Sequence, residues 1–151
     1  MSALAAGQVA PEIPGVDFGS AGPIALFFYK VTCPVCQMAA PKVQMFEDAY
    51  PGRILGVGQD PPEELARFGA EYAMSFRCLP DLPPYATSNA FGIEVVPTLF
   101  LVEGSGAILA SAESWDREGF NAISRRLSEL TGSPYRSISE PGDGLPPFRP
   151  G

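Results

Sequence analysis

The sequence predicts an α/β fold in which a central mixed β-sheet lies between helices. Strand and helix patterns alternate along most of its 151 residues, which is the order typical of parallel strands joined by covering helices. The continuous apolar run Ile24–Tyr29 has the length of a strand that is buried on both faces. The turn at Gly104–Gly106 folds the last strand back as a hairpin, which adds an antiparallel edge to the sheet.

The other elements follow from periodicity and from residues that begin or end helices. Residues 1–22 are punctuated by proline and glycine, and we expect them to wrap around the domain with at most one short strand. A helix is predicted over 35–50, and Pro41 inside it should kink it. Asp60 and Asp116 are of the residue type that caps helices, and each precedes a predicted helix. In chain order, the remaining predictions are strands at 53–57 and 76–79, helices at 61–72 and 85–91, strands at 98–102 and 107–111, and a last helix with an apolar face of Phe120, Ile123, Leu127 and Leu130.

The composition changes near the end of the sequence. Residues 132–151 contain five prolines and four glycines, which do not favour regular structure. We therefore predict one domain over residues 1–131, followed by a tail. The tail is expected to pack loosely on its own domain or on a neighbouring subunit, away from Cys33. Pro146–Phe148 is the one segment of it that could dock on an apolar groove.

Charge and residue types exclude several classes of function. Ten Lys and Arg against 17 Asp and Glu give a net charge of −7, so nucleic acid and anionic membranes are poor partners. The absence of histidine excludes His-based triads, and we expect neither a metal nor a cofactor. We identify no export leader and no apolar run long enough to cross a bilayer. We therefore expect a cytoplasmic protein, or a periplasmic one if a leader has been removed from the chain.

The main candidate site is the motif Cys33-Pro34-Val35-Cys36, which follows a predicted buried strand and opens a helix. Disulfide exchange needs a thiolate, and the free N–H groups and dipole of a helix start stabilise one. We expect Cys33 to attack and Cys36, one turn further along, to resolve the mixed disulfide. The alternative is half of a zinc site or two inert thiols, but zinc needs further ligands and only Cys78 remains to provide one.

Several separate stretches resemble the thioredoxin-like superfamily. Pro41 follows Cys36 at the five-residue spacing of thioredoxins, and Phe91–Leu101 resembles the segment that holds the superfamily's cis-proline. Leu4–Pro11 is similar to the start of redoxin domains, and Ile54–Asp81 supplies an additional β-α insertion that plain thioredoxins lack. Nearly the whole predicted domain therefore resembles TlpA-like, redoxin-type thiol-disulfide oxidoreductases, which are relatives of the alkyl hydroperoxide reductase and thiol-specific antioxidant proteins.

The resemblance implies a thioredoxin-like fold and an enzyme that exchanges its dithiol with disulfides of proteins or small thiols, in antioxidant defence and cell redox homeostasis. It implies that the peptide bond before Pro97 is cis and that Pro97 packs against Cys33. The substrate-binding residues that it implies are Thr32, Pro34, Val96 and Pro97. It also implies a redox partner, whereas the oligomeric state is left open.

The chain departs from thioredoxin where that family has a buried acid that relays protons. Phe27 occupies this position, so the proton of the resolving step must go to water or to another group, either Glu94 or Asp60. The only lysines, Lys30 and Lys42, flank the motif. They either help to keep Cys33 deprotonated or are ordinary surface charges.

Two other functions are open at this stage. A peroxiredoxin-like thiol peroxidase would carry Pro and Thr ahead of its reactive cysteine, but Leu26 and Lys30 hold those positions and Thr32 is adjacent to the cysteine. Arg117 or Arg125 would then have to polarise the peroxide. A non-catalytic binding module with a thioredoxin fold would need neither cysteine of the motif.

Two residues outside the motif have ordinary interpretations. Cys78 lies between apolar neighbours and is expected to be a buried, inert thiol, with a third redox thiol as the alternative. Trp115 is expected to pack in the core ahead of the last helix.

Overall fold

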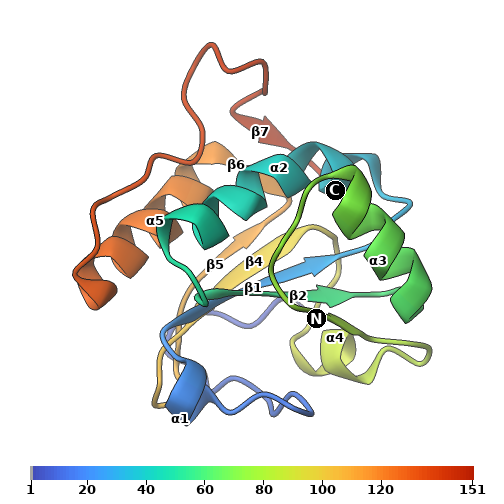
Figure 1. Cartoon of the computed structure of the whole chain (residues 1–151). Coiled ribbons are helices and arrows are strands. Elements are labelled where there is room, and N and C mark those ends of the chain that lie inside the picture. The colour runs from blue at the N-terminus through green and yellow to red at the C-terminus, as the bar shows by residue number, and fades with distance from the viewer. Residues whose placement is uncertain (1) are drawn as a thin grey trace.

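The computed structural model describes residues 2–151, so Met1, the first residue of the predicted domain, lies outside the described residues. Its strands are β1 (Ile24–Tyr29), β2 (Ile54–Gly58), β3 (Cys78–Pro80), β4 (Thr98–Val102), β5 (Ile108–Glu113), β6 (Trp115–Asp116) and β7 (Phe148–Arg149). The first five form one sheet with the order β3-β2-β1-β4-β5 (Figure 1). β1, β2 and β3 are parallel to one another, while β4 runs antiparallel to both β1 and β5. The predicted α/β class with a central mixed sheet is confirmed.

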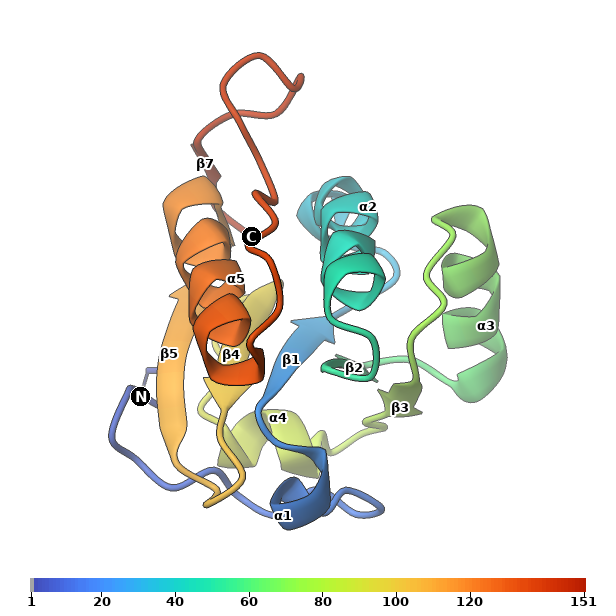
Figure 2. The same cartoon turned by 60° about the vertical axis from the view of Figure 1, so that its left-hand side comes forward.

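Helices cover both faces of the sheet. The helices are α1 (Phe18–Ala21), α2 (Pro34–Ala49), α3 (Pro62–Glu71), α4 (Ala86–Ala90) and α5 (Arg117–Thr131). α2, α3 and α5 lie on one face, and α1 and α4 lie on the other (Figures 1 and 2). Within residues 2–151, no helix has the length and apolar character needed to cross a bilayer.

The strand β1 is apolar throughout because it separates two cores. Phe27 and Tyr29 pack in the cluster beneath α2, α3 and α5, and Leu26 and Phe28 pack in the cluster on the opposite face. All six residues of the strand are buried. An uninterrupted apolar run is what a central strand covered on both faces requires.

Two of the predicted helix caps are wrong in detail. α3 begins at Pro62, its N-cap residue is Pro61, and no side chain caps it. The carboxylate of Asp60 instead accepts the backbone N–H of Val31 at 2.8 Å. Asp116 does stand at the N-cap position of α5, but its side chain makes no capping hydrogen bond.

The buried stripe of α5 also differs from the prediction at one residue. Phe120, Ile123 and Leu127 are buried, as expected, whereas Leu130 is 40% exposed. Ser124 is buried in its place on the stripe, with its hydroxyl 2.8 Å from the hydroxyl of Tyr50. Hydrophobic periodicity cannot predict this position, because a polar residue occupies it.

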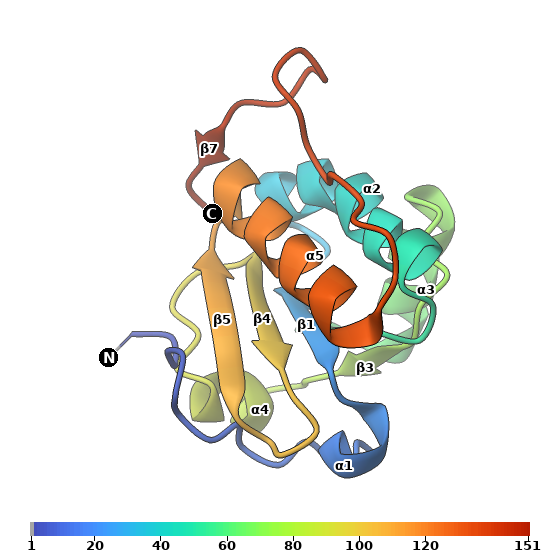
Figure 3. The same ribbon diagram turned by 90° about the vertical axis from the view of Figure 1, so that its left-hand side faces the viewer.

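The prediction of a loosely packed tail is wrong. After α5 the chain turns back along α5 and α2 (Figure 3), and Ile138 is completely buried in the core cluster. The side-chain oxygen of Asn121 accepts the backbone N–H groups of Ile138 and Ser139, at 2.8 and 3.1 Å. The Tyr50 hydroxyl accepts the N–H of Arg136 at 3.0 Å. These polar side chains on helices hold the tail against the domain although the tail has almost no regular structure.

The second half of the tail is fixed by charge and by a short strand pairing. Asp143 forms ion pairs with Lys42 at 3.0 Å and with Arg117 at 3.5 Å. The indole N–H of Trp115 donates to the carbonyl of Pro146 at 2.7 Å, and β7 then pairs antiparallel with β6. Trp115 is fully buried, as expected, but it also anchors the tail.

Candidate active site

The motif Cys33–Cys36 lies at the start of α2, with Cys33 as the N-cap residue. The Cys33 Sγ accepts the backbone N–H of Cys36 at 3.2 Å, so the sulfur takes the place that an oxygen holds in an ordinary helix cap. Pro34 is the first helical residue, a position where its missing N–H costs no hydrogen bond. The sulfur of Cys33 therefore lies where free N–H groups and the helix dipole favour a negative charge.

The two cysteines of the motif differ in their exposure. Cys33 is half-buried, whereas Cys36 is fully buried, and both are free thiols. Burial raises the pKa of the Cys36 thiol above its ordinary value, and the neighbouring Cys33 and the carboxylate of Asp60 raise it further. A disulfide in solution can thus reach Cys33 first, while Cys36 stays protonated behind it.

The sheet topology brings a second segment to the same place. β1 and β4 are antiparallel neighbours with Phe28 opposite Thr98, so the residues after β1 and those before β4 emerge at the same edge. The carbonyl of Val96, just before β4, accepts the thiol of Cys33 at 3.5 Å. The peptide bond between Val96 and Pro97 is cis. Pro97 is buried, and its carbonyl accepts the N–H of Ser114 at 2.7 Å.

The remaining candidate residues lie around this centre. Thr32 and Pro34 are exposed on either side of Cys33.

The two lysines that flank the motif both have acidic partners. Lys30 Nζ lies 3.9 Å from Asp60 Oδ1 and 5.9 Å from the ring centre of Tyr85. Lys42 pairs with the tail. Each lysine thus has a carboxylate partner, which is the arrangement of an ordinary surface charge.

The two candidate proton acceptors have different surroundings. Glu94 is exposed. Asp60 has a side chain that is only 12% exposed, and it is held by the N–H of Val31 just ahead of the motif. Its negative charge contributes to the raised pKa of Cys36. The structure therefore places an acid near the buried thiol, although it comes from the end of β2 and not from β1 as in thioredoxin.

Sequence reasoning missed Tyr29, which was treated only as a core residue. Its hydroxyl is buried and lies beside the Cys78 thiol. Burial raises the pKa of both groups, and that of Tyr29 is raised further by Cys78. Cys78 itself is half-buried and not fully buried as expected. The sequence signal for this pair is the hydroxyl of Tyr29, the one polar side-chain atom in the otherwise apolar run Ile24–Tyr29.

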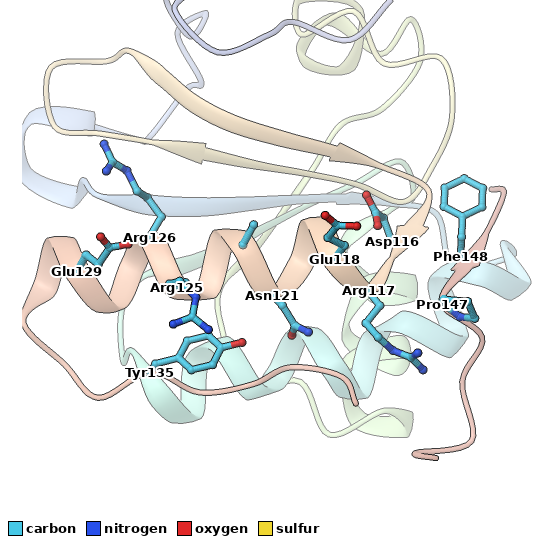
Figure 4. Close-up of a pocket in the computed structure, with 11 residues that line it drawn as sticks. Asp116, Arg117, Glu118, Asn121, Arg125, Arg126, Glu129, Tyr135, Pro147 and Phe148 are labelled. Carbon is cyan, nitrogen blue, oxygen red and sulfur yellow. The ribbon is translucent and has the colours of Figure 1, made fainter. Parts of the chain in front are cut away.

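The two arginines considered for a peroxidase are both engaged by the tail. Arg117 donates to the Ser139 hydroxyl at 3.0 Å and to the Leu145 carbonyl at 2.8 Å. The guanidinium of Arg125 stacks 4.0 Å above the ring of Tyr135. Both side chains lie along the outer groove of α5 (Figure 4).

A dithiol at the start of a helix, set against a cis-proline loop on a mixed sheet, defines the class of thioredoxin-like proteins. The chain belongs to the AhpC/TSA family, because the sequence pattern of that family matches residues 12–111, about two thirds of the chain. No curated protein matches the chain in sequence.

Solved structures from several bacteria share the fold. A protein described as the thiol:disulfide interchange protein DsbE from Chlorobium tepidum superposes with a TM-score of 0.72 at 20% identity, over 83% of this chain and 97% of that one. The thioredoxin domain of a thiol-disulfide oxidoreductase from Bacteroides vulgatus superposes with a TM-score of 0.69 at 21% identity, over 82% of this chain and 99% of that one. A secreted disulfide oxidoreductase from Mycobacterium tuberculosis superposes with a TM-score of 0.56 at 18% identity, over 71% of this chain and 81% of that one. At these identities the similarity establishes the thioredoxin-like fold.

Proposed function

We propose that this chain is a thiol-disulfide oxidoreductase that exchanges the Cys33–Cys36 dithiol with disulfides of proteins or small thiols. The observation that carries the proposal is the pairing of an accessible sulfur at a helix start with a buried thiol one turn behind it. The described functions of the structural neighbours, which are thiol:disulfide interchange proteins and disulfide oxidoreductases, agree with it.

The proposed reaction has two exchange steps. The thiolate of Cys33 attacks one sulfur of the substrate disulfide, and the other sulfur leaves as a thiolate that takes a proton from water. Cys36 then loses its proton and attacks the Cys33 sulfur of the mixed disulfide, which releases the second substrate thiolate. The substrate disulfide gains two electrons and the enzyme dithiol loses two, forming the Cys33–Cys36 disulfide. A redox partner reverses these steps to restore the dithiol.

In this proposal, Asp60 receives the proton of Cys36 in the second step, directly or through water. A buried thiol with a raised pKa is a poor nucleophile until a base takes its proton. Asp60 is favoured over Glu94 because its carboxylate is partly buried, has a fixed position and acts on Cys36 electrostatically. Thr32, Pro34, Val96 and Pro97 are the proposed substrate-binding residues, because they surround the Cys33 sulfur or follow the carbonyl that it contacts.

A thiol peroxidase is the alternative function. Both candidate arginines bind the tail, so neither is available to polarise a peroxide at Cys33. We expect the reduced protein to react with hydrogen peroxide at the slow rate of an ordinary thiol. Rapid oxidation of Cys33 in stopped-flow measurements would favour the peroxidase.

Cysteine variants test the proposed function directly in an insulin-reduction assay. Cys33→Ser should abolish activity, whereas Cys36→Ser should accumulate a mixed disulfide between Cys33 and the substrate, visible by mass spectrometry. Cys78→Ser is the matched control and should keep most of the activity, because Cys78 takes no part in either step. Activity that survives Cys33→Ser, or a mixed disulfide formed through Cys36, would refute the assignment.

A further inference from the structure

Residues 148–151, which we call the strap, end beside Val96, one of the proposed substrate-binding residues. The backbone of Gly151 lies so close to the carbonyl of Val96 that a Cβ atom on Gly151 would overlap it. The same carbonyl accepts the thiol of Cys33 at 3.5 Å. The backbone N–H of Gly151 donates to the hydroxyl of Ser114 at 3.1 Å. The strap and the reactive sulfur therefore share one backbone carbonyl.

The strap approaches this position as an added β-strand. β7 pairs antiparallel with β6, with Arg149 opposite Trp115 and Phe148 opposite Asp116. The residue before β6, Ser114, is bound through its N–H to the carbonyl of Pro97. The strap also contacts α2, because Arg149 Nη1 lies 3.9 Å from the sulfur of Met38. An extended peptide that added a strand beside Cys33 would have to occupy the same path.

The strap is held by its short pairing with β6 and by the hydrogen bond from Gly151 to Ser114, whereas the segment before it is also held by ion pairs. Residues 143–147 are fixed by the ion pairs of Asp143, by hydrogen bonds from Arg117 to the carbonyls of Leu145 and Pro147, and by the hydrogen bond from the indole of Trp115 to Pro146. All four residues of the strap are exposed, so none of its side chains is buried in the domain.

Phe148 is the largest side chain of the strap and is 54% exposed. It stands at one end of an open groove of about 800 Å³ along α5, beside Asp116 and Pro147 (Figure 4). It therefore adds little apolar burial, and the strap can leave while residues 143–147 stay in place.

We propose that the surface formed by β6, Ser114 and Val96 binds an extended segment of a disulfide-bearing protein, and that the strap occupies this surface until the substrate strand displaces it. The inference rests on the proposed function and narrows its substrate class to polypeptides that pair as a strand. A small disulfide needs only the sulfur of Cys33 and not the strand-pairing surface. The strap therefore reduces the affinity for proteins more than the reactivity towards small disulfides.

Two variants that dislodge the strap test the proposal. One lacks residues 148–151, and the other is Gly151→Ala, whose methyl group would overlap the Val96 carbonyl. Gly69→Ala is the matched control, because the same methyl group on α3 meets no atom closer than 3.6 Å. The kcat/KM for insulin should rise between about threefold and tenfold in both strap variants, the factor expected if the strap is closed in roughly 70–90% of molecules. The rate with the small disulfide 5,5′-dithiobis(2-nitrobenzoate) should change less.

Three other results would contradict the strap proposal or the proposed function. An unchanged or lower ratio of the insulin rate to the small-disulfide rate in both variants would overturn the proposal. Loss of folding in both variants would overturn it too, because a segment required for folding cannot leave during substrate binding. If the unmodified chain and both variants exchange neither disulfide, the proposed function itself fails and not the strap alone.

Discussion

Cys33 and Cys36 lie in one helical turn, yet Cys33 is half-buried and Cys36 is fully buried. The Cys33 sulfur accepts the backbone N–H of Cys36. Cys36 itself packs among core residues, and this burial raises its pKa. The sequence motif predicts that Cys33 lies at the helix start and Cys36 one turn further along, but it does not predict how deeply each is buried. It does not predict the position of Asp60, which depends on how β2 lies beside β1.

The role of Asp60 gives a prediction for the resolving step. Asp60→Asn keeps an oxygen that can accept the Val31 N–H but removes the proton acceptor, so the mixed disulfide should persist roughly tenfold longer or more. The lifetime is measured by quenching single turnovers with acid, as a function of pH. Glu94→Gln is the matched control and should leave the lifetime unchanged. The reverse pattern would assign the proton transfer to Glu94.

The buried ionisable groups predict how the stability of the reduced protein depends on pH. Burial raises the pKa values of Cys36, Cys78 and Tyr29, so the folded state keeps protons that the unfolded chain releases. Their contribution to stability is fully present below the ordinary thiol pKa of 9.0 and is lost as the pH rises above it.

The melting temperature of the reduced protein should therefore fall between about pH 8 and about pH 10, the range in which free thiols titrate. Replacing one of these groups in Cys78→Ala should make the fall less steep. A melting temperature that stays constant or rises over this range would contradict the burial of these groups.

At the scale of elements, the predictions succeeded where hydrophobic pattern decides the structure. β1, β4 and the buried stripe of α2 follow directly from apolar spacing. The tail could not be predicted in this way, because a single apolar residue, Ile138, enters the core and polar side chains on α2 and α5 fix the backbone around it. Sequence spacing carries no signal for hydrogen bonds between distant segments.

The tail gives a prediction about stability. Removal of residues 132–151 takes Ile138 out of the core and breaks the hydrogen bonds that Tyr50 and Asn121 make to the tail backbone. A buried aliphatic side chain contributes about 2–5 kcal/mol, and each intramolecular hydrogen bond adds about 0.5–1.5 kcal/mol. The melting temperature should fall by roughly 10–20 °C, measured by circular dichroism.

Removal of residues 148–151 alone is the matched control for this deletion. It takes away only exposed residues, so the melting temperature should stay within a few degrees of that of the full chain. If both deletions had the same small effect, the first part of the tail would not belong to the core.

At the scale of the whole molecule, the sheet topology assembles the site. Antiparallel pairing of β1 with β4 carries Val96 to Cys33, and the hairpin to β5 then carries Ser114 and β6 alongside. The contact between Cys33 and the Val96–Pro97 segment was predicted, from the motif and from the resemblance of Phe91–Leu101 to a cis-proline segment. The prediction that the tail lies away from Cys33 is wrong, because Gly151 reaches the Val96 carbonyl that Cys33 also contacts, and this place depends on the path of the whole tail over α5 and α2.

A redox titration tests the central claim most directly. The protein is equilibrated in glutathione buffers of graded potential, quenched with acid and alkylated, and its cysteines are assigned by peptide mass spectrometry. We predict one two-electron transition in which Cys33 and Cys36 form a disulfide with each other, while Cys78 remains a thiol throughout. A disulfide that joins Cys78 to either motif cysteine, or a motif that binds glutathione without closing its own disulfide, would contradict the account.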